Sequence, residues 1–188
     1  EGMGFEDINI AFSKDLGVGY TFFTVYASTT HTVDYTSIHV EEVEKEEMTM
    51  DEIDALIREK IGRKIIVVGA CTGTDAHTVG IDAIMNMKGY AGHYGLERYQ
   101  MIDACNMGAQ VPNEELLARA MEIKADAILI SQVVTQKDIH ISNLKNMVEL
   151  MEAQGVRDDF ILICGGPRIS HQLARELGYD AGFGSGSF

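Results

Sequence analysis

The feature that most constrains the fold is an unbroken apolar run at residues 65–71, IIVVGAC. Such a run is typical of a strand that is buried on both faces of a sheet. From there, short apolar segments alternate with helical stretches about five times. This alternation predicts an α/β domain over residues 61–188, a doubly wound, Rossmann-like, five-stranded parallel sheet. The predicted strands are 65–71, 100–107, 127–131, 160–164 and 179–183, and the predicted helices are 81–87, 112–125, 140–154 and 169–177.

Residues 1–60 have a different pattern and predict a small α+β module outside the main sheet. The stretch 20–28 is rich in aromatic and β-branched residues, and 34–43 alternates in polarity, so both are predicted strands. Thr49 is a good N-cap for a helix that follows. We expect this β-β-α module to mediate dimerisation, since its aromatic strand suits an interface as well as a core.

The composition excludes two classes of partner. The chain has 29 acidic and 15 basic residues, a formal net charge of −14, whereas nucleic-acid binding needs clustered positive charge. No apolar stretch is long enough to span a bilayer, so no membrane partner is expected. Cys71, Cys105 and Cys164 lack metal-ligand spacing, which indicates buried thiols in a reducing, cytoplasmic compartment. Because the sequence starts at Glu1 and stops in a Gly-Ser stretch, we expect the natural protein to be longer at both ends.

The loop after the first predicted strand carries a D-x-H-x-x-G pattern formed by Asp75, His77 and Gly80. It is not the G-x-G-x-x-G fingerprint of dinucleotide sites. An imidazole nitrogen is a good ligand for a transition metal such as cobalt, and a nearby carboxylate can fix its tautomer. The glycine leaves room for a large ligand near the backbone. The alternative is an ordinary loop histidine.

This pattern resembles the cobalamin-binding module in which a protein histidine replaces the cofactor's own dimethylbenzimidazole. In that family a Ser of an S-x-L motif ends the third strand, where this chain has Ser131 followed by Val133, a departure from leucine. The resemblance implies that His77 ligates the cobalt and that small residues line a slot for the nucleotide tail. The cofactor-binding residues expected on this basis are Thr74, Asp75, Ala76, His77, Thr78, Val79, Gly80, Leu129, Ser131, Val133, Gly165, Gly166, Pro167, Phe183 and Gly184.

Lys88 lies eleven residues after His77. If the stretch between them is one helix, about three turns return Lys88 to nearly the same face, roughly 16 Å along the axis. Apolar neighbours such as Ile84 and Met87 would then lower its pKa and favour a Schiff base. Taken alone, an exposed lysine at a helix end is the simpler interpretation.

Five segments, residues 33–43, 73–99, 131–136, 164–168 and 179–184, carry a wider resemblance. They resemble the β subunits of lysine 5,6-aminomutases, which depend on adenosylcobalamin and pyridoxal 5′-phosphate. The resemblance implies that Lys88 forms a Schiff base with pyridoxal phosphate. It also implies a radical 1,2-amino shift on lysine or β-lysine, carried out only with a larger TIM-barrel α subunit that holds most of the pyridoxal phosphate and substrate site, as an α2β2 assembly.

Three alternatives remain open at this point. Ornithine 4,5-aminomutase shares the histidine–lysine arrangement, usually within a longer chain. A methyl-carrying corrinoid module has no need of a Schiff-base lysine. A flavodoxin-like signalling domain would leave the D-x-H-x-x-G loop unexplained. The sequence does not decide between lysine, β-lysine and ornithine as the amino-acid substrate.

Overall fold

The computed structural model describes residues 5–17, 20–29 and 48–185. Contacts divide the chain into two compact units, residues 1–40 and 41–188. The division falls earlier in the chain than the boundary at residue 60 that the sequence suggested. Each unit is described by itself below.

The first unit contains an antiparallel hairpin of β1 (Phe5–Gly17) and β2 (Tyr20–Thr29). The predicted strand 20–28 is therefore confirmed, whereas β1 was not predicted. The other predicted strand, 34–43, lies outside the described residues. Large apolar side chains of the hairpin are about half exposed, namely Ile8, Ile10, Phe12, Phe22, Phe23, Val25 and Tyr26.

Helix α1 (Met50–Lys60) begins where the sequence predicts, with Thr49 and Glu52 forming a capping box. It belongs to the second unit and not to the N-terminal module. The cause is Asp54, a buried carboxylate that accepts hydrogen bonds from the backbone amides of Gln100 (3.0 Å) and Met101 (2.8 Å). These bonds attach α1 to the segment that leads into the main sheet.

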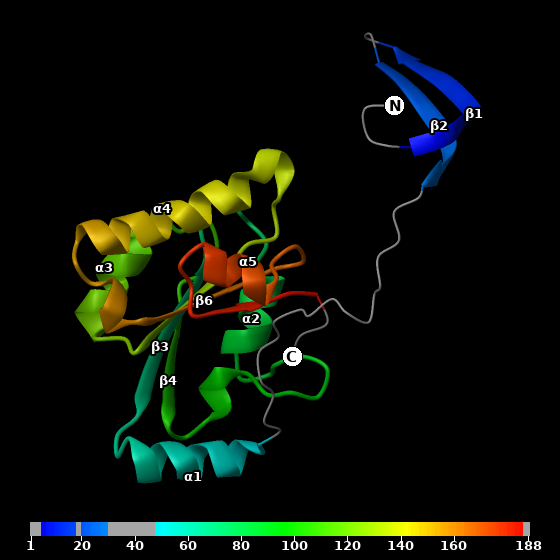
Figure 1. The fold of residues 1–188 in the computed structure, drawn as a ribbon. Helices are drawn as coiled ribbons and strands as arrows, with labels where there is room; N and C mark the ends of the chain where they lie inside the picture. The colour runs from blue at the N-terminus through cyan, green and yellow to red at the C-terminus, as the bar shows by residue number, and fades with distance from the viewer. Residues whose placement is uncertain (1–4, 18–19, 30–47, 186–188) are drawn as a thin grey trace. The chain divides into compact units, whose positions relative to one another are not determined.

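The second unit is built on the predicted five-stranded sheet, and every pairing in it is parallel. The strand order is β4-β3-β5-β6-β7, so the chain moves outward from β3 in both directions (Figure 1). Ligands of such sheets bind beyond the carboxyl ends of the strands, at the point where this direction changes. The strands are β3 (Ile65–Cys71), β4 (Ile102–Asn106), β5 (Ala127–Ser131), β6 (Ile161–Gly165) and β7 (Ala181–Phe183).

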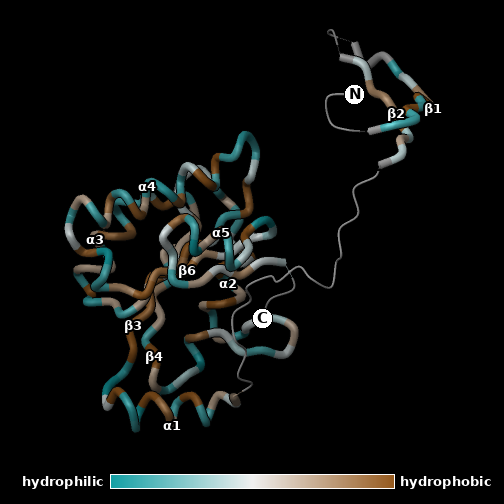
Figure 2. Tube along the Cα trace, viewed as in Figure 1, coloured by the Kyte–Doolittle hydropathy of each residue, from teal (hydrophilic) through white to brown (hydrophobic). Residues whose placement is uncertain are grey.

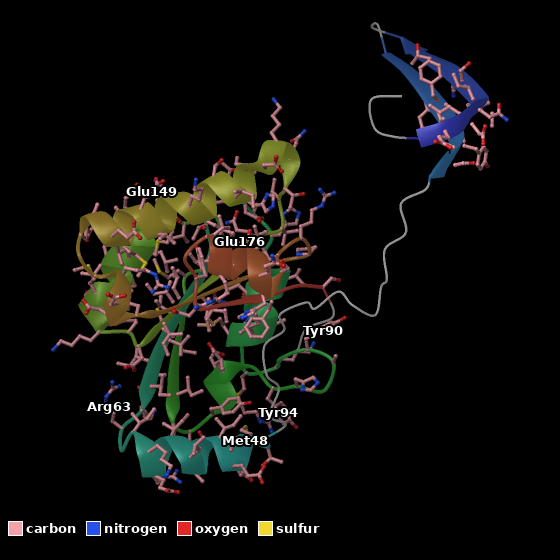
Figure 3. The ribbon with its side chains drawn as sticks, in the orientation of Figure 1. Met48, Arg63, Tyr90, Tyr94, Glu149 and Glu176 are labelled. Atoms are coloured by element: carbon pink, nitrogen blue, oxygen red, sulfur yellow. The ribbon has the colours of Figure 1, made fainter. Side chains whose placement is uncertain are left out.

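Helices cover both faces of the sheet. On one face α3, α4 and α5 pack on β3, β5 and β6 around a core that includes Leu116, Met147 and Leu162. On the other face α2 packs through Ile81 and Met85. Figure 2 shows brown, hydrophobic stretches along the strands, and Glu149 projects from the outer side of α4 in Figure 3. The helices are α2 (Val79–Met85), α3 (Asn113–Ile123), α4 (Ile139–Ala153) and α5 (His171–Glu176), with 3-10 turns at Leu96–Arg98, Gln136–Asp138 and Arg157–Asp159.

Among the described residues, no helix is both long enough and apolar enough to cross a membrane.

Candidate functional site

The carboxyl edge of the sheet brings the predicted loops together. Cys71, Ser131, Gly165 and Phe183 pair in register across four neighbouring strands, so they form one row at the ends of β3, β5, β6 and β7. The loops that leave this row are the ones that carry the D-x-H-x-x-G pattern, Val133 and the Gly-Gly pair. The strand order therefore places chemistry from distant parts of the sequence at one edge.

Asp75 is the centre of the first loop. Its side chain is 1% exposed, and its Oδ1 lies 2.8 Å from Nδ1 of His77 and accepts the backbone amide of His77 at 3.0 Å. Its Oδ2 accepts the amides of Val133 and Val134, the latter at 3.0 Å. One carboxylate thus orients the imidazole and also ties the β3 loop to the β5 loop.

The hydrogen bonds set the ionisation of Asp75. Burial on its own would raise the pKa of Asp75, but the amides of His77, Val133 and Val134 and the His77 ring outweigh it and lower the pKa below its usual value. A carboxylate only accepts, so Nδ1 of His77 is the protonated nitrogen. Nε2 then keeps its lone pair, and the side chain is 59% exposed. An oriented imidazole with a free Nε2 is a ligand for a transition metal.

Cys71 lies directly beneath this loop, and its Sγ donates to the carbonyl oxygen of His77 at 2.7 Å. Burial raises the pKa of the Cys71 thiol, and burial raises that of Cys164 to about 12. Both thiols are therefore protonated at neutral pH, and both are buried, as the sequence predicts.

Glycines let the backbones of this edge approach closely. A Cβ on Gly166 would lie 1.9 Å from the carbonyl oxygen of Gln132, so only glycine fits there. A Cβ on Gly80 would lie 3.1 Å from Oγ of Ser131, whereas one on Gly165 would meet only Phe183. Two of these glycines therefore allow close packing, and Gly165 alone has ordinary van der Waals room beside it. Little side-chain bulk at the strand ends, next to an exposed imidazole, suits a bulky ligand that binds through its metal.

The other predicted site residues take varied positions. Thr74, Ala76 and Pro167 are exposed, Thr78, Val133, Phe183 and Gly184 are half-buried, and Val79 at the start of α2 is 77% exposed. Leu129 differs from the rest, because it packs with Ile81 and Met85 in the core beneath α2. It is a packing residue below the edge and not part of the edge itself.

Sequence reasoning missed a set of buried polar residues below the His77 loop. Thr72 is 1% exposed, and Nε2 of Gln132 donates to both its carbonyl oxygen and its hydroxyl at 2.9 Å. The Nδ2 of Asn143, on α4, donates to the same hydroxyl at 2.6 Å. Polar residues this far apart in the sequence leave no pattern that shows their contact.

The structure does not contain a single helix from His77 to Lys88, which was the condition for placing both residues on one face. Helix α2 spans only Val79–Met85, and Asn86 after it is extended (φ −74°, ψ 149°). Lys88 lies in the turn that follows, next to Gly89 at φ 65°, and its side chain is exposed. His77 and Lys88 therefore flank opposite ends of α2. The apolar surroundings expected for Lys88 are not buried either, since Ile84 is 46% and Met87 57% exposed.

Local contacts hold the segment that carries Lys88. The backbones of Tyr90 and His93 bond to each other twice at 2.9 Å. A Cβ on Gly89 would lie 1.8 Å from the carbonyl oxygen of His93. The Arg98 guanidinium stacks 3.7 Å from the ring centroid of Tyr94, which Figure 3 labels on this segment. The segment is therefore a folded loop that presents an exposed lysine.

A cavity of about 500 Å³ lies away from these residues, at the amino ends of the strands. Two ion pairs border it, Arg63–Asp126 and Arg157–Asp180. None of the residues that line this cavity belongs to the loops at the His77 edge.

Comparison with known proteins agrees with this geometry. Residues 65–187 match the family described as B12 binding domain, and residues 1–42 match the dimerisation domain of d-ornithine 4,5-aminomutase. A solved cobalamin-binding protein from Desulfitobacterium hafniense DCB-2 superposes with a TM-score of 0.52 at 19% identity, over 71% of this chain and 60% of that one. That likeness shows the fold alone. The sheet and its histidine loop define a cobalamin-binding domain.

The relatives narrow the class. The lysine 5,6-aminomutase beta subunit of Acetoanaerobium sticklandii is 59% identical over 186 residues, 99% of this chain and 71% of that protein. The D-ornithine 4,5-aminomutase subunit beta of the same organism is 39% identical over 132 residues, which is 70% of this chain and 17% of that protein. This chain belongs to the lysine 5,6-aminomutase β subunit family, as the sequence resemblance predicted.

Proposed function

We propose that the chain binds adenosylcobalamin through Nε2 of His77 and serves as the cobalamin-carrying subunit of an aminomutase acting on lysine or β-lysine. The reaction is the 5,6-migration, a radical 1,2-amino shift in lysine degradation. When bound, adenosylcobalamin supplies a carbon-centred radical and pyridoxal phosphate supplies a ring that delocalises electrons from the amine. This chain's part is to hold and orient these groups.

The observation that carries the proposal is the bond between Asp75 and Nδ1 of His77 at 2.8 Å. It fixes the tautomer that leaves Nε2 as a ligand. The same carboxylate is attached to the β5 loop, so the imidazole is oriented before any metal arrives. Ser131, Gly165 and Gly166 provide small side chains beside it for the remainder of the cofactor, together with Gly80 and Gly184.

Lys88 is the residue proposed to bind pyridoxal phosphate as a Schiff base. Its amine is exposed on a folded loop at the far end of α2 from His77. Among the described residues the loop offers no ring of basic groups for a phosphate, so most of the pyridoxal phosphate and substrate site is proposed to lie on a larger TIM-barrel α subunit. We expect an α2β2 assembly in the cytoplasm, where the three free thiols would remain reduced.

The first unit is proposed to join two copies of this chain. The hairpin of β1 and β2 leaves Phe12, Phe23 and Tyr26 between 51% and 66% exposed. A contiguous set of exposed apolar side chains is typical of a surface that binds another protein, so this surface is expected to be covered by another chain. The match of residues 1–42 to a dimerisation domain supports a second copy as that partner.

Specific observations weigh against two alternatives to this function, a corrinoid methyl carrier and an ornithine aminomutase. The corrinoid methyl-carrier interpretation has no use for an exposed lysine on a folded loop after α2. The ornithine enzyme is a more distant relative, at 39% against 59% identity. We therefore favour lysine or β-lysine as the substrate over ornithine.

A titration with adenosylcobalamin tests the proposal. The wild-type chain should shift the absorption spectrum to that of the histidine-ligated cofactor, whereas His77→Ala should bind far more weakly and show no such shift. His140→Ala, which alters another histidine of the second unit, is the control for general loss of imidazole. Equal spectra for wild type and His77→Ala would remove the cobalt-ligand role and leave a likeness of fold.

A further inference from the structure

A second attachment of the His77 loop lies below Asp75 and has no role in the function proposed so far. Thr72, the first residue after β3, is buried, and its hydroxyl meets two side chains. Gln132 comes from the end of β5, and Asn143 comes from the second turn of α4. Through Asn143, helix α4 therefore contacts the first residue of the His77 loop.

The surroundings of Asn143 fix its orientation. Nδ2 of Asn113, the first residue of α3, donates to the backbone oxygen of Asn143 at 3.0 Å and lies 3.3 Å from its Oδ1. A Cβ on Gly73 would lie 3.0 Å from that Oδ1, so the loop backbone rests directly on the amide. Gly73 itself has φ 69°. The amide therefore supports the loop at the point where the chain turns towards His77.

We propose that Asn143 is a positioning residue for the cobalt ligand: through Thr72 and Gly73 it sets where the loop places Nε2 of His77. The inference rests on the proposed cobalt-ligand role of His77. Asp75 fixes the rotation of the imidazole and holds the His77 amide, whereas Thr72 and Gly73 set where the loop leaves β3. Removing the attachment to α4 leaves the ring oriented on a looser loop.

The consequence is a specific loss of cobalamin affinity. Asn143→Leu keeps the size of the side chain but removes the donor to Thr72. We expect the Kd for adenosylcobalamin to rise about five- to tenfold, at the lower end of what residues supporting a metal ligand contribute. Asn146→Leu is the matched control, because Asn146 lies on the same helix but accepts a hydrogen bond from Asn113 at 2.8 Å. Its Kd should stay within about twofold of wild type.

The decisive measurement repeats the substitution in a His77→Ala background. If Asn143 acts through the position of His77, Asn143→Leu changes the Kd in the wild type and leaves it unchanged in His77→Ala. Adenosylcobalamin is the probe, equilibrium dialysis gives the bound fraction in both backgrounds, absorption reports the histidine-ligated fraction where His77 is present, and thermal unfolding confirms that each variant is folded. Thr72→Val, with Thr72→Ser as its hydroxyl-retaining rescue, gives the same test if Asn143→Leu does not fold.

Each outcome decides the matter. An equal loss of affinity in both backgrounds would overturn the inference, because Asn143 would then act on the domain in general. If Asn143→Leu causes no loss of affinity in the wild-type background, the inference is overturned as well. The proposed function would still stand in that case, provided that His77→Ala weakens binding. If His77→Ala itself has no effect, the proposed function fails and the inference fails with it.

Discussion

The two ends of α2 are held in opposite ways. Before the helix, long-range bonds fix the His77 loop: Asp75 is tied to the amides after β5, and Thr72 to Gln132 and to Asn143 on α4. After the helix, the segment with Lys88 is held mainly by bonds within itself and is open to solvent. A metal ligand needs an exact position before binding, whereas a lysine that must reach a cofactor on another subunit needs exposure. The difference suggests that each end is suited to its own proposed partner.

The largest expected effect tests whether contacts within the segment itself hold the loop that carries Lys88. Gly89→Ala puts a methyl group 1.8 Å from the His93 carbonyl at φ 65°, so the loop must rearrange, and we expect a local loss of about 3 kcal/mol. Gly92→Ala is matched, since Gly92 is in the same loop at φ 89° with nothing within 4 Å of its Cβ. It should lose only about 1 kcal/mol from backbone strain. Hydrogen exchange of residues 86–95 measures both, and equal losses would contradict the packed loop.

Loss of the carboxylate should affect the other end. Asp75→Ala removes the partner of Nδ1 and the acceptor of two loop amides, so the Kd for adenosylcobalamin should rise about 10- to 100-fold. Asp103→Ala, which breaks an exposed ion pair with Lys64, is the control and should leave the Kd unchanged. A Kd for Asp75→Ala within about twofold of wild type would show that the imidazole needs no orientation by this group.

Acid should weaken the same attachment. The pKa of Asp75 is lowered in the folded chain from an ordinary value of 3.8, so its ionised form stabilises the fold above that pH. This stabilisation is lost as the pH falls from 3.8 through the lower folded pKa. The difference in unfolding free energy between wild type and Asp75→Asn should therefore be constant near neutrality and shrink in acid. A difference that stays level down to acid pH would mean that the carboxylate is not held ionised.

The smallest expected effect is that of Lys88→Ala on cobalamin binding, and it compares the two ends of α2 most directly. Lys88→Ala should leave the Kd for adenosylcobalamin within about twofold of wild type, because nothing in the His77 loop depends on it. In the assembled enzyme, borohydride reduction followed by peptide mapping should place pyridoxal phosphate on Lys88, and the variant should lose this label. Lys137→Ala, which alters an exposed lysine in the turn between β5 and α4, is the control. Label retained in Lys88→Ala would assign the Schiff base elsewhere.

The sequence predicts the sheet well because buried parallel strands leave apolar runs, and each of the five predicted strands overlaps one in the structure. The sequence predicts poorly where charged residues interrupt the apolar pattern of a strand, or where the residues in contact are far apart in the chain. Strand β1 mixes Glu6, Asp7 and Asp15 with apolar residues, so it shows no clear alternation. The helix predicted over 81–87 ends at Met85, because Asn86 is extended (φ −74°, ψ 149°).

The site divides in the same way. Asp75 and His77 are close in sequence, so their spacing predicts their contact, which the structure contains. The support from Gln132 and Asn143 arises only when β5 and α4 fold against β3. Asparagine on a helix gives no sign of such a role, because its usual place is solvent or a cap.

The cobalt ligand is best tested by electron paramagnetic resonance of cob(II)alamin bound to protein labelled with 15N only in histidine. If Nε2 of His77 is the ligand, the superhyperfine splitting changes from the triplet of 14N to the doublet of 15N, and this doublet disappears in His77→Ala. A triplet that persists in the labelled protein would show that the cofactor's own base remains on the cobalt, which would contradict the account.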